Sequence, residues 1–179
     1  MKIRKGTFET NSSSTHSIAI SKNKVNIPVG RSINFYIGKY GWEEDEYNFP
    51  SYMYTSLLCN DDEEGFQKLK SILDKWKVKY NFEKPEWEYY NGYRYLQNGY
   101  IDHSSETFSI MREILDDEDL LARALFGDAT VYTGNDNGSE NDSMCWCSDE
   151  YYYDWDDNGE KKLNPNHDSE HYDYFFKGN

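Results

Sequence analysis

Cysteine is scarce in this chain and long apolar runs are missing, and both absences limit what the protein can be. The three cysteines, Cys59, Cys145 and Cys147, are a poor framework for disulfides and lack the second half of a zinc site. No apolar run approaches the roughly 18 residues that would span a bilayer. Residues 1–5 lead into polar sequence, unlike a signal peptide. We therefore expect a cytoplasmic protein without a membrane anchor, a bound metal or a disulfide-linked partner.

Hydrophobic residues are also few, and aromatic residues make up much of their share. Only 37% of the chain is hydrophobic, but 17% of it is aromatic, including 17 Tyr, 9 Phe and 5 Trp. Large amphipathic rings can build a core where aliphatic side chains are few, so we do not expect a disordered chain. Because domains commonly contain about 100–200 residues, the length of 179 residues predicts a single domain covering 1–179.

Positive charge is scarce over most of the chain, whose formal net charge is −14. Residues 1–39 are the exception, because seven basic residues there oppose one acidic residue, which leaves −20 for residues 40–179. An acidic surface repels nucleic acid and attracts basic proteins, whereas a basic patch beside a polar loop can hold phosphate. The alternative is that the negative charge serves solubility alone.

Short alternating or apolar segments predict strands before and after a group of helices. The predicted strands cover residues 3–10, 17–21, 31–38, 129–133 and 172–176. Cap residues followed by apolar positions at helical spacing predict helices over residues 61–77, from Ser104 or Ser105 to Leu115, and over residues 120–125.

Two Asn-Gly pairs, at 91–92 and 98–99, predict a hairpin within residues 89–101, whereas residues 40–54 resist assignment. The elements lack a regular βαβ alternation. The sequence therefore predicts an α+β fold, with an antiparallel or mixed sheet and two to three helices packed on one face.

The polar run near the N-terminus, residues 10–17, is the first candidate site, and we expect it to connect two early strands. Hydroxyl and amide groups can bind phosphate oxygens, basic side chains supply charge, and a histidine can move a proton near neutral pH. His16, with Ser13 and Ser14, forms the predicted catalytic group. The predicted substrate-binding residues here are Lys2, Arg4, Lys5, Asn11, Ser12 and Thr15. The alternative is a serine-rich loop that satisfies its own backbone.

His103 is the second candidate, at the expected junction of an extended segment and a helix. Two histidines, one accepting and one donating a proton, suffice to cleave RNA through attack by its 2′-hydroxyl. Asp102 or Glu106 could orient a ring, and Glu106 is assigned to substrate binding. The alternative is that His103 and Asp102 only cap the helix.

The third candidate follows the strand predicted at residues 129–133, within the turn-forming cluster 134–138. Asn135 and Asp136 could coordinate a hard cation such as Mg²⁺ or position a substrate hydroxyl there, and turn formation explains the same residues equally well. They matter for catalysis only if the fold brings them beside His16. Phosphate-binding loops, dinucleotide fingerprints and the common hydrolase and zinc-protease motifs do not occur in the sequence.

The opening, residues 2–17 (KIRKGTFETNSSSTHS), resembles the start of small proteins from phages and mobile elements of Gram-positive bacteria. In length and opening, the chain is similar to type II anti-CRISPR proteins, some of which trim the spacer end of the guide RNA of an RNA-guided DNA nuclease. This resemblance covers about a tenth of the chain. It implies action inside a bacterial host cell, with the effector nuclease and its guide RNA as partners.

The leading hypothesis is an anti-CRISPR protein that binds the effector through its acidic surface and cleaves or trims the guide RNA at the N-terminal patch. The first alternative is a non-catalytic inhibitor that mimics nucleic acid and blocks the DNA-binding channel. The second alternative is a nucleotide-dependent or cofactor-dependent modifying enzyme. The sequence does not identify a cofactor.

Overall fold

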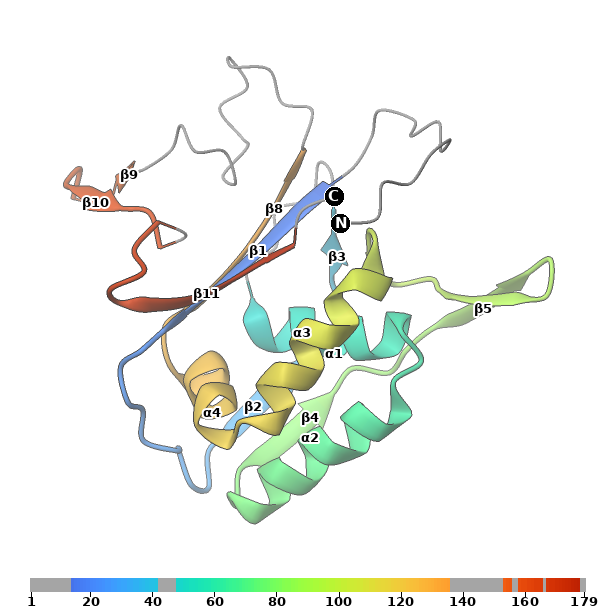
Figure 1. Ribbon diagram of the computed structural model, residues 1–179. Helices are drawn as coiled ribbons and strands as arrows, with labels where there is room; N and C mark the ends of the chain where they lie inside the picture. Colours follow the sequence, from blue (N-terminus) through green and yellow to red (C-terminus); the bar gives the residue numbers. More distant parts are fainter. Residues whose placement is uncertain (1–13, 42–47, 136–152, 156–157, 166, 178–179) are drawn as a thin grey trace.

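A three-stranded antiparallel sheet with helices packed against it forms the centre of the fold (Figure 1). The computed structural model describes residues 14–41, 48–135, 153–155, 158–165 and 167–177, and every structural statement below concerns these residues. Strand β1 (Ser14–Ser21) lies between β8 (Ala129–Asn135) and β11 (Tyr172–Lys177), and both pairings are antiparallel. The strands predicted at 17–21, 129–133 and 172–176 are thus confirmed, although each is longer than predicted.

The sheet buries one face against the helices because its apolar residues alternate with period two. Ile18 and Ile20 of β1 are buried, and Ile18 lies opposite Val131 of β8, which is also buried. Phe175 of β11 lies opposite Ile18 on the other side and packs against the same core. Helices α1, α3 and α4 contact this sheet.

The described residues contain four helices, one more than predicted. These are α1 (Phe49–Cys59), α2 (Glu63–Lys75), α3 (Ser104–Asp116) and α4 (Glu118–Phe126). The caps explain their starts: the side chains of Asn48, Asp62 and Asp117 accept hydrogen bonds from backbone N–H groups in the first turns of α1, α2 and α4. The three predicted helices are confirmed with ends shifted by one to two residues.

Helix α1 was not predicted because it is buried almost all round. Residues 51–57 are buried without interruption, so the helix has no exposed polar stripe that alternates with an apolar one. It contacts α2, α3, α4 and β8, which makes it the central helix of the domain.

The other strands form four separate pairs instead of extending the central sheet. Two pairs are parallel: β2 (Ser32–Phe35) with β4 (Lys79–Phe82), and β3 (Lys39–Tyr40) with β7 (Tyr100–Ile101). Two are antiparallel: β5 (Trp87–Tyr90) with β6 (Tyr93–Leu96), and β9 (Tyr153–Trp155) with β10 (Lys161–Leu163). The sheet predicted as one layer is therefore a three-stranded sheet with small satellite pairs.

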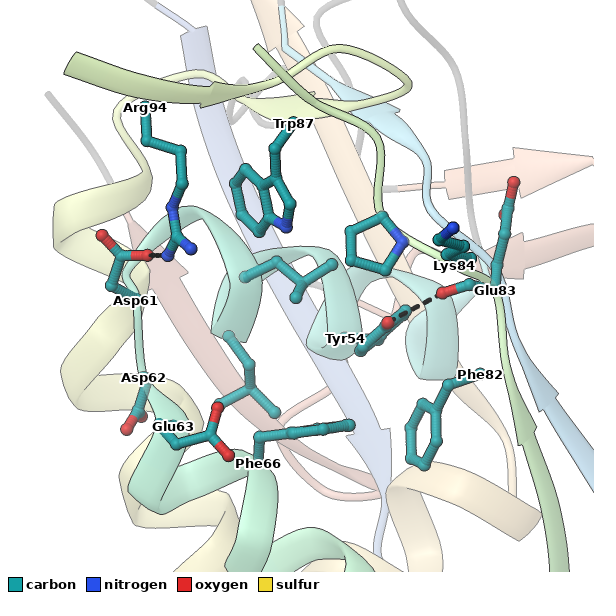
Figure 2. A pocket seen from close by; sticks show the side chains of 13 residues that line it. Tyr54, Asp61, Asp62, Glu63, Phe66, Phe82, Glu83, Lys84, Trp87 and Arg94 are labelled. Carbon is teal, nitrogen blue, oxygen red and sulfur yellow. Dashed lines mark hydrogen bonds and ion pairs between the residues drawn. The ribbon is translucent and has the colours of Figure 1, made fainter. Parts of the chain in front are cut away.

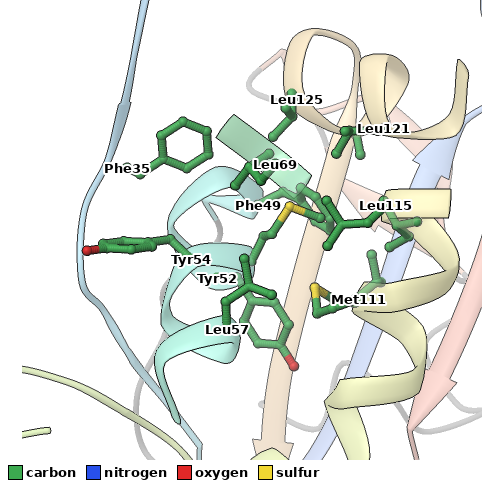
Figure 3. Packing of buried hydrophobic residues seen from close by; sticks show 14 of the residues in the cluster. Phe35, Phe49, Tyr52, Tyr54, Leu57, Leu69, Met111, Leu115, Leu121 and Leu125 are labelled. Atoms are coloured by element: carbon green, nitrogen blue, oxygen red, sulfur yellow. The ribbon is translucent and has the colours of Figure 1, made fainter. Parts of the chain in front are cut away.

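Aromatic rings carry much of the core, as the composition predicted. Phe35 stacks on Phe82 at 4.6 Å between ring centroids, and Tyr54 and Phe66 both lie 4.9 Å from Phe82. Figure 3 shows how aliphatic side chains of α2, α3 and α4 close around the rings of α1. The buried residues form one contiguous cluster, and the α+β class predicted from the sequence is confirmed.

Candidate functional site

The N-terminal polar segment is not wholly a loop, because Ser14, Thr15 and His16 belong to β1. Lys2, Arg4, Lys5, Asn11, Ser12, Ser13 and Asp136, together with the strand predicted at 3–10, lie outside the described residues. The prediction that the polar run connects two strands is wrong for Ser14, Thr15 and His16. The backbone ladder with β8 continues through these residues, whatever their side chains.

The predicted turn at 134–138 is wrong at its start for the same reason. Gly134 and Asn135 extend β8, where they lie opposite Thr15 and Ser14 of β1. Two of the three polar segments singled out in the sequence therefore converge at one end of the central sheet. Asn135 lies two register steps beyond the pair His16 and Thr133.

His16 is buried, with only 1% of its surface exposed. It lies on β1 in phase with Ile18 and Ile20, so the alternation of the strand turns it toward the core. Its Nδ1 atom lies 3.0 Å from the hydroxyl oxygen of Tyr52, a buried residue of α1, and the two rings are tilted by 45°. In the described structure, His16 exchanges hydrogen bonds inside the protein and does not face a ligand in solvent.

Tyr52 connects His16 to a second buried tyrosine. The ring of Tyr40 packs edge-on against Tyr52 with 4.8 Å between centroids, and both residues are fully buried. Burial first, and then the neighbouring Tyr40, raise the pKa of Tyr52 well above its usual range. The Tyr52 phenol therefore stays neutral and acts as a hydrogen-bonding group, not as a base.

His103 lies beyond Tyr40 in this chain of contacts. The carbonyl oxygen of Tyr40 accepts a 2.8 Å hydrogen bond from the backbone N–H of Asp102, directly before His103. Nε2 of His103 lies 3.8 Å from Oδ1 of Asp102, and more than a third of each side chain is exposed. The two histidines thus lie at opposite ends of a path through Tyr52 and Tyr40, with His103 at the solvent end.

His103 occupies the N-cap position of α3 but does not cap it with its side chain. Its backbone is left-handed, with φ of 52°, which turns the chain from β7 into the helix. Glu106 follows as an exposed acidic residue in the first turn, where it opposes the positive end of the helix dipole. With its side chain 37% exposed, His103 is the more accessible of the two histidines.

The hairpin of β5 and β6 is the most exposed aromatic element of the described structure. Its turn, Asn91-Gly92, has positive φ at both residues, as the Asn-Gly pair predicted. Tyr90 and Tyr93 lie opposite each other and are 69% and 79% exposed, and Tyr95 on the same face is 43% exposed. We call Tyr90, Tyr93 and Tyr95 the tyrosine face. Glu88 lies opposite Tyr95, and its carboxylate accepts a hydrogen bond from the Tyr95 hydroxyl.

The other face of the hairpin closes a pocket of about 490 Å³ against the corner between α1 and α2 (Figure 2). Trp87 and Arg94 lie on the hairpin side of this pocket, and Phe66 and Phe82 lie across from them. The guanidinium of Arg94 sits over the Trp87 ring, 4.1 Å from its centroid, and also pairs with Asp61. A volume in this range suits a small ligand or one large side chain.

The pocket was not predicted from the sequence, because its walls come from three distant segments. The hairpin itself was predicted, but α1 and its turn into α2 were not. The signal that could have found the pocket is the aromatic and charged composition of residues 82–96, which is unusual for a strand pair exposed on one side only.

The described residues offer little support for metal or thiol chemistry. They contain no group of three or more His, Cys, Asp or Glu side chains that could hold a metal ion. Cys59 is a free thiol, and burial raises its pKa, which disfavours the reactive thiolate. Among the helices that the structure describes, none has the length and apolarity needed to cross a membrane.

Comparison with known proteins found no match, whether among family models, curated proteins or solved structures.

Proposed function

We propose that this protein is an inhibitor that binds a basic, nucleic-acid-handling protein, and that its partner is a type II RNA-guided DNA nuclease. The tyrosine face is the observation that carries the proposal. Three tyrosines on one side of a protruding hairpin leave a large amphipathic surface in water, and tyrosine is enriched in the energetic centres of protein interfaces.

The charge of the chain supports a basic partner. The formal net charge of −14 makes electrostatic attraction to a Lys/Arg-lined channel favourable and contact with nucleic acid unfavourable. Glu88 places a carboxylate within the tyrosine face itself. The resemblance of residues 2–17 to anti-CRISPR proteins selects the type II effector among the basic proteins that could fit.

The burial of His16 favours binding over catalysis as the inhibitory mechanism. A general base must lie within hydrogen-bond reach of the proton that it removes, and the ring of His16 is 1% exposed with Nδ1 held by Tyr52. Inhibition by occupying the effector, with the guide RNA left intact, needs no such access.

The test is a DNA-cleavage assay with a type II effector that carries an end-labelled guide RNA. The wild-type protein is expected to stop DNA cleavage, to bind less tightly as salt rises, and to leave the guide at full length. A variant with Tyr90→Ser and Tyr93→Ser is expected to bind at least about tenfold more weakly. Tyr36→Ser is the matched control, because Tyr36 is 54% exposed but lies outside the hairpin. Full DNA cleavage at saturating protein would refute the proposal for that effector.

Trimming of the guide RNA is the second candidate function, and the position of His103 favours it. Its exposed ring beside Asp102 lies at the solvent end of the path to His16, and Asn135 lies near His16 in the sheet. A shortened guide on a denaturing gel, absent with His103→Ala but present with Tyr90→Ser, would establish this activity in place of simple blockade.

A further inference from the structure

The pocket beneath the hairpin already holds a guanidinium group, and this group belongs to the chain itself. The guanidinium of Arg94 lies 4.1 Å from the centroid of the Trp87 ring and forms an ion pair with Asp61. The same group therefore makes a cation–π contact and an ion pair. Figure 2 shows the ion pair of Arg94 with Asp61 and the Trp87 ring beside Arg94. An indole face with a carboxylate beside it is a recognised arrangement for binding an arginine side chain.

The rest of the pocket also suits a side chain that is apolar along its length and cationic at its end. Tyr54, Leu57, Phe66 and Phe82 provide an apolar floor. Four acidic residues line the pocket, Asp61, Asp62, Glu63 and Glu83, together with the two cations Lys84 and Arg94. Asp62 is paired with Arg112 from α3, and the carboxylate of Glu83 accepts a 2.8 Å hydrogen bond from the backbone N–H of Ile37. The local charge therefore favours a cationic occupant over an anionic one.

The side chain of Arg94 can leave its contacts with Trp87 and Asp61 easily. Its side chain is 40% exposed and that of Asp61 is 67% exposed, and ion pairs and cation–π contacts at exposed sites are individually weak. Replacing one guanidinium by another preserves both contacts, so the exchange has little net penalty. Arg94 then competes with the incoming arginine for the same contacts with Trp87 and Asp61.

We infer that this pocket is an arginine-binding site, in which an arginine side chain of a protein partner displaces Arg94 from Trp87 and Asp61. The inference rests on the proposed function only in naming a basic protein as the source of that arginine. It adds a specific recognition element on the face of the hairpin opposite to the tyrosine face.

The test uses the tripeptide acetyl-Gly-Arg-Gly-amide and its citrulline counterpart, a neutral molecule of nearly the same shape. The full-length protein is titrated with each peptide while NMR follows the indole N–H of Trp87, assigned by its loss in Trp87→Phe. The arginine peptide is expected to shift this signal saturably, and the citrulline peptide is expected to leave it in place.

The internal competitor provides the sharpest variant. Arg94→Gln removes the internal guanidinium and is expected to tighten binding of the arginine peptide by about threefold to thirtyfold, the combined value of one exposed cation–π contact and one exposed ion pair. Asp61→Asn is expected to weaken binding when it is added to Arg94→Gln, whereas in the wild type the losses to the peptide and to Arg94 largely cancel. Arg31→Gln is the control, since Arg31 is exposed and lies outside this pocket.

Two results would overturn the inference. Equal binding of the citrulline peptide would make the pocket a site for neutral ligands, and an affinity that is the same in Arg94→Gln with and without Asp61→Asn would remove the carboxylate from recognition. If Arg94→Gln loosens the hairpin, the backbone amides of Trp87 and Leu96 will shift without peptide, and the comparison of the arginine and citrulline peptides in the wild type then decides. Because these titrations contain no effector, their failure is distinct from a failure of the tyrosine face.

Discussion

Removing the hydroxyl of Tyr52 is expected to destabilise the protein because the buried His16 loses a hydrogen bond to that hydroxyl. Tyr52→Phe keeps the ring that packs on Tyr40, so it creates no large cavity. It removes the 3.0 Å hydrogen bond to Nδ1 of His16, a residue that is 1% exposed. Leaving a buried polar group without its partner costs about 1–3 kcal/mol.

The loss can be followed by urea unfolding and by thermal melting. In a chain of this length, each kcal/mol corresponds to about 2–4 °C, so Tyr52→Phe should lower Tm by roughly 2–12 °C. The slope of the urea transition should stay unchanged, because the folded structure buries the same surface. Tyr36→Phe is the control, since Tyr36 is 54% exposed and should leave Tm unchanged.

A double-mutant cycle isolates the interaction between the two side chains. The effect of Tyr52→Phe is expected to shrink by about 0.5–3 kcal/mol when it is measured in a His16→Phe background, because the partner is then already absent. Additive effects of the two changes would show that the hydrogen bond contributes nothing. Loss of guide-RNA trimming in Tyr52→Phe at unchanged stability would instead make the pair part of a catalytic site.

The remaining predictions concern two other polar contacts in the fold. Arg112 pairs with the buried Asp62, and its Nε donates a 2.7 Å hydrogen bond to the carboxylate. Arg112→Met is therefore expected to lower the free energy of unfolding in urea by about 2–4 kcal/mol. A decrease below about 0.5 kcal/mol would refute the pairing. Burial and a hydrogen bond to Asp128 raise the pKa of Tyr172 to about 12. Folded Tyr172 therefore keeps its proton where the unfolded chain loses it, so the free energy of unfolding should fall between pH 10 and about 12, and less steeply in Tyr172→Phe.

Local patterns predicted the elements whose determinants lie within a few residues. The capping pattern of residues 60–63 predicted the start of α2 to within two residues, although Asp62 and not Asn60 is the N-cap. Asn91-Gly92 forms the predicted hairpin turn. The residues of α1 gave no periodic signal, because a helix buried on every side has no polar face to mark its period.

The candidate site was predicted less well, for two physical reasons. The polar run up to Ser17 was interpreted by composition, but backbone pairing with β8 extends the strand through Ser14 regardless of side chain. His16 was assigned a catalytic role, but it lies on the same face of β1 as Ile18 and Ile20, which belong to the hydrophobic core. Extending the predicted strand by one residue toward the N-terminus would have placed His16 on that face.

The two faces of the β5–β6 hairpin are energetically linked, because an isolated two-stranded ribbon is only marginally stable in water. Trp87 and the buried Leu96 pair on the inner face, and Arg94 attaches that face to Asp61 at the corner of α1 and α2. These contacts hold the tyrosine face in position. Displacement of Arg94 leaves the pairing of Trp87 with Leu96 in place. A partner that contacts both faces makes its second contact at high effective concentration, so occupation of the pocket and docking of the tyrosine face should reinforce each other in one complex.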